Sequence, residues 1–259
     1  MVDKDVALRL IKDKPWHHSF EIIPGVHTVG AYDPKGLWDE LKLPENMEGM
    51  SLADIGASNG YFSFEARRRG AKVTAFDFRH KDNSGFGLAQ YINGLDDILH
   101  YHVNVLDISA EEYGTFDIVL ALGLLYHVAD PYRALVNCAS LSNDRLIIES
   151  YCIDSKVGNQ LSKLPIMMFI PDAERFPEQG QPNTDRSNFW GFTSTCLYKM
   201  VEDIGFSVTR YRVKNDRVLI DAKRASVDPS HTRLHVAYSI IPHCPIDGDP
   251  NKPESWHIF

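Results

Sequence analysis

A glycine-containing loop that follows a short apolar run is the first feature able to do chemistry. It reads D-I-G-A-S-N-G at 54–60, where Gly56 and Gly60 let the backbone turn sharply and let a ligand approach closely. Ser58 stands where the dinucleotide pattern G-x-G-x-x-G has the middle glycine that admits a pyrophosphate. The loop therefore predicts a ligand without a pyrophosphate. Its alternative interpretation is a tight strand-to-helix turn with no ligand.

Two acidic residues follow the next two apolar runs. Asp77 lies about 20 residues beyond Gly56, the spacing at which a carboxylate meets ribose hydroxyls, and Phe78 could pack on an adenine. Asp107, in N-V-L-D at 104–107, could accept a hydrogen bond from the adenine amino group. S-adenosylmethionine fits this set, because it has no phosphate and its positive sulfonium tolerates carboxylates. A helix N-cap at Asp77 and a turn at Asp107 are the alternatives.

An alternation of strands and helices must position these groups. The almost wholly apolar run 116–122 is typical of a central parallel strand covered on both faces. Strands are expected at 51–55, 72–77, 101–105, 116–122, 145–151, 206–213 and 217–222, and helices at 61–69, 86–93, from 131 and from 193. The predicted fold class is α/β: a Rossmann-like, doubly wound, seven-stranded sheet ending in an antiparallel hairpin. The motifs then lie at the carboxyl ends of the strands, where ligands bind in such sheets.

The pattern divides the chain into three regions. Residues 1–46 are an N-terminal leader or lid, 47–224 the Rossmann-like domain, and 225–259 a C-terminal extension rich in Pro and His. Within the domain, 152–190 shows no clear period and is expected to be an irregular insertion on the acceptor side.

The composition excludes some kinds of partner. A net charge of −8 argues against a large nucleic-acid footprint. Four scattered cysteines without a C-x-x-C pair, and a start without an apolar h-region, indicate a cytoplasmic protein with reduced thiols. No apolar run is long enough to span a bilayer, so no membrane partner is expected. A homodimer is left open.

Together, these segments resemble the class I S-adenosylmethionine-dependent methyltransferases over about residues 50–222. The most specific part is F-D-I-V-L-A-L-G-L-L-Y-H-V-A-D-P at 116–131, which looks like the segment lining the methionine end of the cofactor. The resemblance implies S-adenosylmethionine as cofactor and S-adenosylhomocysteine as product. The cofactor contacts that it implies are Asp54, Gly56, Ala57, Ser58, Gly60, Asp77, Phe78, Leu106, Asp107, Leu122 and Trp16.

A narrower resemblance covers about residues 15–222. W-H-H-S-F-E-I-I-P-G-V-H-T, S-N-G-Y-F, L-G-L-L-Y-H-V-A-D-P, I-I-E-S-Y-C-I-D and N-F-W-G-F-T-S-T look like the branch containing the tRNA wobble-uridine carboxymethyltransferases. Those enzymes use carboxy-S-adenosylmethionine, whose extra carboxylate needs Lys or Arg plus a hydroxyl, because a buried unpaired charge is costly. Tyr126 matches the hydroxyl position, but His17 and His18 stand where that branch tends to have a basic residue. Lys35 and Arg212 are possible substitutes.

The sequence accordingly predicts methyl transfer to a small-molecule acceptor. Carboxymethyl transfer to tRNA is the alternative, and a non-catalytic S-adenosylmethionine-binding module is a third. The tRNA alternative needs a basic tract, and the sequence offers only R-R-R at 67–69, which is typical of a solvated helix face.

Two adjacent residues after the fourth strand are the candidate catalytic residues. A hydroxyl acceptor needs a base, and His127 is the natural choice, although it could equally brace the loop; Tyr126 is expected to contact the methionine portion or the acceptor. The candidate acceptor contacts are His17, Phe189, Trp190 and Tyr151.

Two further expectations concern the surroundings of the site. Met167, Met168 and Phe169 could extend an apolar acceptor pocket or belong to the core. Trp16, His17 and Phe20 could close over the site as a lid or pack as an edge strand. The histidines fit no ligand spacing, so no metal is expected.

Overall fold

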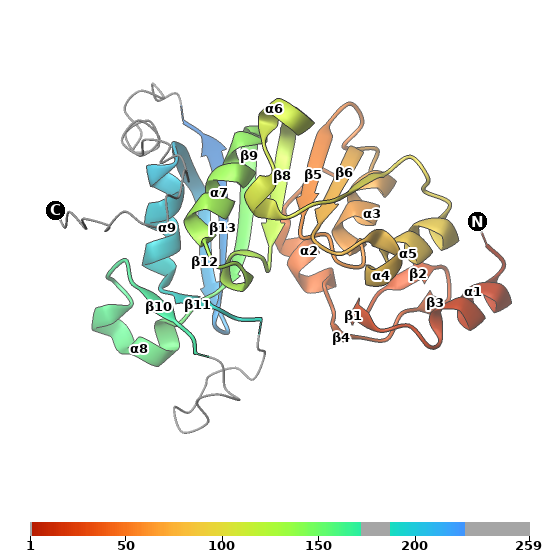
Figure 1. Ribbon diagram of the computed structural model, residues 1–259, viewed down its shortest axis with the longest axis horizontal. Helices are drawn as coiled ribbons and strands as arrows, with labels where there is room; N and C mark the ends of the chain where they lie inside the picture. The colour runs from red at the N-terminus through yellow and green to blue at the C-terminus, as the bar shows by residue number, and fades with distance from the viewer. Residues whose placement is uncertain (1, 172–186, 226–259) are drawn as a thin grey trace, which may run out of the picture.

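A seven-stranded sheet organises the computed structural model, which describes residues 2–171 and 187–225. The strand order is β12-β13-β9-β8-β5-β6-β7. The strands are β5 (Ser51–Ile55), β6 (Lys72–Asp77), β7 (Leu99–His102), β8 (Phe116–Leu122), β9 (Ser142–Tyr151), β12 (Phe206–Lys214) and β13 (Arg217–Arg224). β13 runs antiparallel to both of its neighbours, whereas β5 to β9 pair in parallel. The predicted fold class is confirmed, including the terminal hairpin, whose second strand lies inside the sheet (Figure 1).

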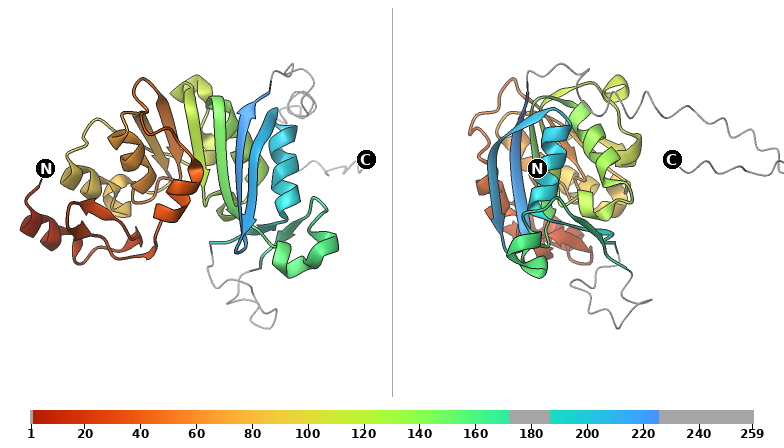
Figure 2. Two further views of the ribbon diagram at one scale, coloured as in Figure 1. Left: turned by 180° about the vertical axis from the view of Figure 1, so that it is seen from behind. Right: turned by 90° about the vertical axis from the view of Figure 1, so that its left-hand side faces the viewer.

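Helices cover both faces of this sheet and enclose two hydrophobic cores. α7 (Pro131–Ser140) and α9 (Ser194–Asp203) pack on one face, and α2 (Lys35–Leu41), α3 (Tyr61–Arg68) and α5 (Phe86–Asn93) on the other (Figure 2). Side-chain caps begin α7 and α9: Asp130 accepts from the Arg133 N–H and Thr193 from the Cys196 N–H. The short helices are α4 (Lys81–Ser84), α6 (Ala110–Tyr113), η1 (Val105–Asp107) and η2 (Leu125–His127).

The leader is a packed layer on the second core. It contains α1 (Lys4–Ile11), β1 (Trp16–His18), β2 (Glu21–Ile23), β3 (Val26–His27) and β4 (Gly30–Tyr32). β1 pairs in parallel with β4, and a Cβ at Gly30 would lie 2.4 Å from the backbone of His18, so only glycine allows this pairing. Trp16, Phe20 and Ile22 are buried in the same core as α3 and α5. The leader is therefore packed on the domain, and whether it also closes over the site as a lid stays a prediction.

Two expectations need correction. The strand expected at 101–105 occupies Leu99–His102, because Asn104 accepts from the Leu106 N–H and starts η1 there. The insertion is more regular than expected: it holds α8 (Asp154–Leu161) and the hairpin of β10 (Met167–Phe169) with β11 (Trp190–Phe192). The extension at 226–259 lies outside the described residues.

Candidate cofactor and acceptor site

The glycine loop lies at the carboxyl end of β5, at the lower edge of the sheet in Figure 1. Gly56, Ser58 and Gly60 have φ of +81°, +53° and +89°, so the sharp turn that the sequence indicated is present. The N–H groups of Gly56 and Ala57 both donate to the Phe76 carbonyl at the end of β6, at 2.8 and 3.1 Å. This arrangement fixes the loop against the strand that ends in Asp77.

Asp77 is buried and held in a fixed orientation. Its Oδ2 accepts from the Ser58 N–H at 2.7 Å, and its Oδ1 accepts from the Arg79 N–H at 2.8 Å. The Arg79 side chain adds a second link, because Nη2 donates to the Ser58 hydroxyl at 3.1 Å. Each carboxylate oxygen has two lone pairs, so Asp77 can still accept from ribose hydroxyls. Sequence reasoning missed Arg79, although it stands two residues after Asp77.

The residues expected around the adenine lie on adjoining elements. Phe78 is 69% exposed, and its carbonyl lies 2.8 Å from Nε2 of His102 on β7. The Asp77 carbonyl accepts from the Val103 N–H at 2.9 Å, which brings the start of η1 beside Phe78. Leu106 is half-buried and Asp107 exposed on η1. These residues, with Asp77, fit the adenosine half of S-adenosylmethionine.

Asp54, the first residue of the D-I-G-A-S-N-G motif, is a buried charged residue. It is 2% exposed, and the Ser63 hydroxyl donates to its Oδ2 at 2.6 Å. Burial raises the pKa of Asp54 to about 6, with a further contribution from the charge of Asp77. Ionised Asp54 adds negative potential where the positive end of the cofactor is expected.

Replacing Asp54 by asparagine is expected to remove a pH dependence of stability. The native pKa of about 6 lies above the ordinary 3.8, so between these values the folded state holds a proton that the unfolded state has released. The free energy of unfolding of the wild type should therefore receive a contribution that falls by up to about 3 kcal/mol as the pH rises through this window. Denaturant unfolding at several pH values should show this fall missing from D54N.

Asp117→Asn provides a control of opposite sign. Hydrogen bonds from the Ser51 N–H and hydroxyl, both at 2.8 Å, hold the pKa of Asp117 below its usual range. Its contribution to stability is present at neutral pH and is lost as the pH falls through the lowered pKa. The effect of each substitution on the free energy of unfolding should change with pH in opposite directions for D54N and D117N. A change in the same direction would contradict the raised pKa of Asp54 and the lowered pKa of Asp117.

An ion pair between buried Glu149 and half-buried Arg217 lies at the carboxyl end of β8 and β9. The Arg217 guanidinium donates to both oxygens of Glu149 at 2.5 Å, and its Nη1 donates to the Tyr126 hydroxyl at 3.2 Å. The same guanidinium lies 5.0 Å from the centre of the Tyr126 ring. Tyr151 is buried beside this group, with its ring 6.2 Å from that of Tyr126. Half-buried Leu122 precedes this group at the end of β8.

Sequence reasoning missed Arg217 and Glu149 and proposed other cations. Arg212 pairs with Glu40, and Lys35 is exposed on α2. The guanidinium beside Tyr126 is therefore that of Arg217, on the last strand. A single sequence gives no sign of this, because 68 residues separate Arg217 from Glu149.

His127 is held by the segment that precedes β11. Its Nδ1 lies 3.1 Å from the Ser187 carbonyl oxygen and 2.9 Å from the Ser187 hydroxyl. The Phe189 N–H donates to the Tyr126 carbonyl at 2.8 Å, and the Trp190 indole N–H to the Ala129 carbonyl at 3.1 Å. The candidate acceptor contacts Phe189 and Trp190 thus lie directly against the loop that carries the candidate base.

The leader reaches the glycine loop through Asn59. The Asn59 side-chain oxygen accepts from the N–H groups of His17 and His18 at 2.6 and 3.1 Å, and its amide donates to the Ser84 carbonyl. Asn59 is 1% exposed, so this link is internal. Sequence reasoning quoted Asn59 within the motif but gave it no role.

Trp16 and Tyr32 are two aromatic residues of the leader that lie near this link. The Trp16 indole N–H donates to the Ile11 carbonyl at 3.2 Å, and its ring is buried. Tyr32 on β4 lies with its ring 6.0 Å from that of His18, and the charges of Glu149 and Arg217 act on its hydroxyl. Burial, with the charges of His17 and Arg79, lowers the pKa of His18 to about 3, so this imidazole is neutral. The leader thus packs beside the glycine loop, to which it is bonded through Asn59.

Comparison with known proteins agrees with this geometry. Residues 33–211 match the family model described as a methyltransferase domain, which is more than half of the chain. The chain is a class I S-adenosylmethionine-dependent methyltransferase.

Two curated relatives differ in their reactions. The tRNA U34 carboxymethyltransferase of Helicobacter pylori (strain Shi470) is 26% identical over 182 residues, 66% of this methyltransferase and 67% of the relative. The ubiquinone biosynthesis O-methyltransferase of Psychrobacter arcticus is 32% identical over 172 residues, covering 65% of this chain and 64% of that one. Both reactions are therefore represented among relatives at similar distance.

Solved structures of methyltransferases share the fold of this chain. The N-terminal domain of EvdMO1 with bound S-adenosylhomocysteine has a TM-score of 0.61 and 20% identity, covering 87% of this methyltransferase and 98% of that chain. Magnesium protoporphyrin IX methyltransferase from Synechocystis with bound S-adenosylmethionine has a TM-score of 0.51 and 18% identity, covering 74% and 77%. This methyltransferase is an enzyme that uses S-adenosylmethionine, so the third alternative, a non-catalytic module, gains no support.

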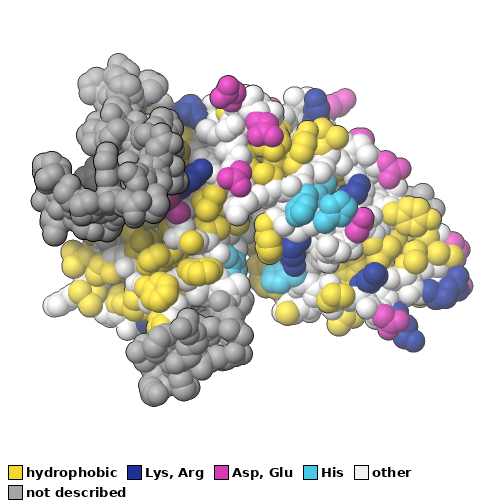
Figure 3. Space-filling view, in the orientation of Figure 1, with side chains coloured by type: hydrophobic (Ala, Val, Ile, Leu, Met, Phe, Trp, Pro, Cys, Tyr) yellow, Lys and Arg dark blue, Asp and Glu magenta, His cyan; other side chains and the backbone are white. Residues whose placement is uncertain are grey.

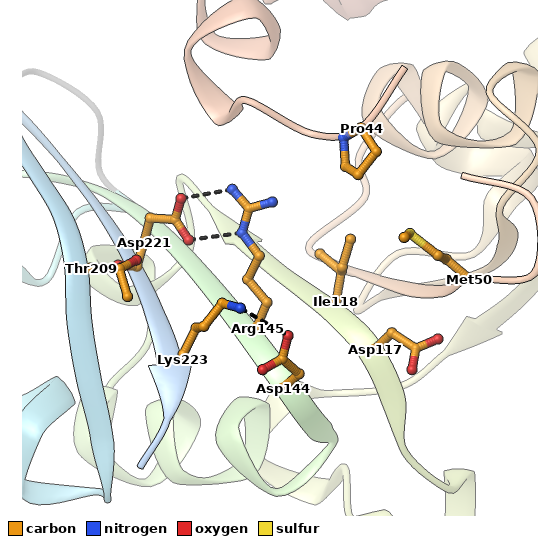
Figure 4. A pocket seen from close by; sticks show the side chains of 9 residues that line it. All are labelled: Pro44, Met50, Asp117, Ile118, Asp144, Arg145, Thr209, Asp221 and Lys223. Atoms are coloured by element: carbon orange, nitrogen blue, oxygen red, sulfur yellow. Dashed lines mark hydrogen bonds and ion pairs between the residues drawn. The ribbon is translucent and has the colours of Figure 1, made fainter. Parts of the chain in front are cut away.

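A pocket of about 320 Å³ opens at the opposite edge of the sheet (Figure 4). Its polar residues are largely paired with one another: Arg145 makes two hydrogen bonds to Asp221, at 2.9 and 2.7 Å, and also donates to the Leu41 carbonyl at the end of α2. The network holds α2 on the sheet of the methyltransferase. We therefore assign this pocket a structural role.

The basic tract R-R-R is occupied by contacts within the methyltransferase. Arg67 forms an ion pair with Asp97, Arg68 pairs with Glu65, and Arg69 donates to the carbonyls of Leu43 and Pro44. The tract lies on a partly solvated face of α3, and two of its residues also bind neighbouring segments.

Among residues 2–171 and 187–225, no helix is both long and apolar enough to cross a bilayer. In that part of the chain, no three His, Cys, Asp or Glu side chains lie together as a set that could hold a metal ion.

Proposed function

We propose that this methyltransferase transfers a methyl group to a hydroxyl of a small-molecule acceptor, with His127 as the base. The carbonyl and the hydroxyl of Ser187 both lie within hydrogen-bond distance of Nδ1 of His127. In the tautomer with the proton on Nδ1, the carbonyl accepts that proton and Nε2 is the basic nitrogen. S-adenosylmethionine supplies a methyl carbon on a positive sulfur, and the sulfur keeps the bonding electron pair when the acceptor oxygen bonds to that carbon. The acceptor proton passes to Nε2 of His127.

The observation that carries methyl rather than carboxymethyl transfer is the Glu149–Arg217 ion pair. Glu149 already balances the charge of Arg217, Asp77 faces Arg79, and His18 is neutral. A carboxylated donor would bring one more negative charge to an edge where these cations are already matched, and an unmatched buried charge is costly. The positive sulfonium of the ordinary donor suits this edge.

Carboxymethyl transfer to tRNA remains the second candidate because of one contact. The guanidinium of Arg217 beside the Tyr126 hydroxyl is the kind of cation-plus-hydroxyl set that a carboxylated donor requires. Arg217 has five N–H groups, so its bonds to Glu149 and Tyr126 leave donors for a further carboxylate. The relative from Helicobacter pylori adds to this candidate.

Mass spectrometry of the nucleoside that co-purifies with the protein separates the two candidates. S-adenosylmethionine or S-adenosylhomocysteine is expected. Recovery of the carboxylated form would overturn the proposal in favour of carboxymethyl transfer. A protein that purifies empty is tested by titration with both donors, and tighter binding of the carboxylated one would have the same meaning.

A further inference from the structure

Exposed apolar side chains gather on the hairpin beside the candidate base. All three residues of β10 are exposed, with Met167, Met168 and Phe169 at 43, 38 and 56%. Phe189, just before β11, is 39% exposed. Successive residues of a strand point to opposite faces, so Met167 and Phe169 lie on one face of the hairpin together with Trp190, the partner of Phe169, and Met168 lies on the other. We name the surface formed by Met167, Phe169 and Trp190 the hairpin platform.

The hairpin is built to keep this platform outward. Gly191 of β11 approaches Ile153 so closely that a Cβ would lie 2.5 Å from that side chain. Phe192 and Ile170 are both buried in the first core, which anchors the two strands. Because the hairpin is fixed to the core by these residues, the exposure of its other side chains is a property of the fold.

The hairpin platform adjoins the segment that carries the candidate base His127. Phe169 and Trp190 face each other across the two strands, with ring centres 5.5 Å apart at an interplanar angle of 71°. The Trp190 indole is bonded to Ala129, two residues after His127, and the Phe189 N–H is bonded to Tyr126. Histidine side chains reach the surface between the hairpin and the leader (Figure 3). The aromatic side chains of Phe169 and Trp190 therefore lie next to the loop that carries His127.

We propose that the hairpin platform binds the acceptor and that the acceptor is a planar aromatic hydroxyl compound. This inference rests on the proposed function and names its substrate class. The rings of Phe169 and Trp190 stabilise a flat aromatic ligand through edge-to-face and stacking contacts. A phenolic hydroxyl on that ring lies toward His127 and can give up its proton there, whereas the platform residues themselves offer no charge for a phosphate.

Equilibrium dialysis of 2-naphthol in the presence of S-adenosylhomocysteine tests the platform without requiring turnover. Phe169→Ala should raise the Kd for 2-naphthol about tenfold, which corresponds to about 1.4 kcal/mol. Phe169→Tyr keeps the ring and should restore binding. Tyr91→Ala removes an aromatic side chain that is 61% exposed on α5 and should leave the Kd unchanged. Cyclohexanol, which lacks the aromatic ring, should bind at least tenfold more weakly.

The outcomes separate this inference from the proposed function. Equal Kd values for wild type and F169A would overturn the platform, as would a dimer that dissociates on this substitution, because a second copy would then be the occupant. Methyl transfer from deuterated S-adenosylmethionine is measured in parallel. Transfer to polar alcohols without an effect of F169A would sustain the proposed function and reject the platform. Binding of 2-naphthol without transfer to any hydroxyl would reject the proposed function alone.

Discussion

Replacement of Gly60 by alanine is expected to lower the free energy of unfolding by about 3 kcal/mol or more. Gly60 has a φ of +89°, a conformation that costs an alanine roughly 1–2 kcal/mol. A Cβ there would also lie 2.6 Å from the ring of Phe64 and 2.7 Å from that of Phe86. Both rings are fully buried, so neither can move away without disturbing the core. Denaturant unfolding measures the loss directly.

Gly49→Ala is the matched control for this prediction. Gly49 has a similar φ of +80°, but nothing lies within 4 Å of the Cβ that it would gain. It should therefore show only the backbone cost, about 1 kcal/mol. Equal losses in G49A and G60A would mean that the two rings adapt, and the packing argument would fail. The affinity for S-adenosylmethionine should fall in G60A alone, because Gly60 belongs to the loop that we propose binds the cofactor.

His127→Ala is expected to reduce kcat by about 100- to 10,000-fold, the usual contribution of a general base. The Kd for S-adenosylmethionine should stay within about twofold of wild type, because the variant leaves the proposed cofactor contacts, Asp77 and the glycine loop, unchanged. Added imidazole should restore part of the rate.

The control for this second prediction is His27→Ala. His27 lies on β3 with its side chain 65% exposed, and it contacts Glu21 in the leader. Its loss should leave kcat unchanged. An equal loss of cofactor affinity and turnover in H127A would show that His127 supports the loop, which is the alternative that the sequence left open.

The parts of the fold that a single sequence revealed are those whose side chains are buried. β5, β6, β8 and α5 have the expected bounds, because strands and helices between two cores must carry apolar residues in long runs or at helical spacing. α8 and β10 escaped prediction for the opposite reason. No residue of α8 is buried and all of β10 is exposed, so neither leaves a periodic pattern.

For the candidate site too, the sequence indicated the residues that belong to local motifs and missed those whose roles depend on the folded sheet. The loop 54–60 and Asp77 are local motifs, and the structure brings them together through the Ser58 N–H. Arg217, Glu149 and Arg79 were missed, because their roles depend on pairing register and on side-chain direction. The register that sets Arg217 opposite Tyr151, and Leu219 opposite Glu149, is fixed only when the whole sheet forms.

The position of β13 has a consequence for synthesis on the ribosome. β13 is the last strand that the structure describes, yet it lies inside the sheet, between β9 and β12. Until Arg217–Arg224 has emerged, the facing edges of β9 and β12 have no partner, and open edges recruit strands from other chains. Glu149 likewise cannot form its ion pair until Arg217 has been synthesised. Interrupted translation or proteolytic loss of this strand would therefore yield an inactive fragment that is prone to aggregate. The candidate site can assemble only after β13 has been synthesised and has paired.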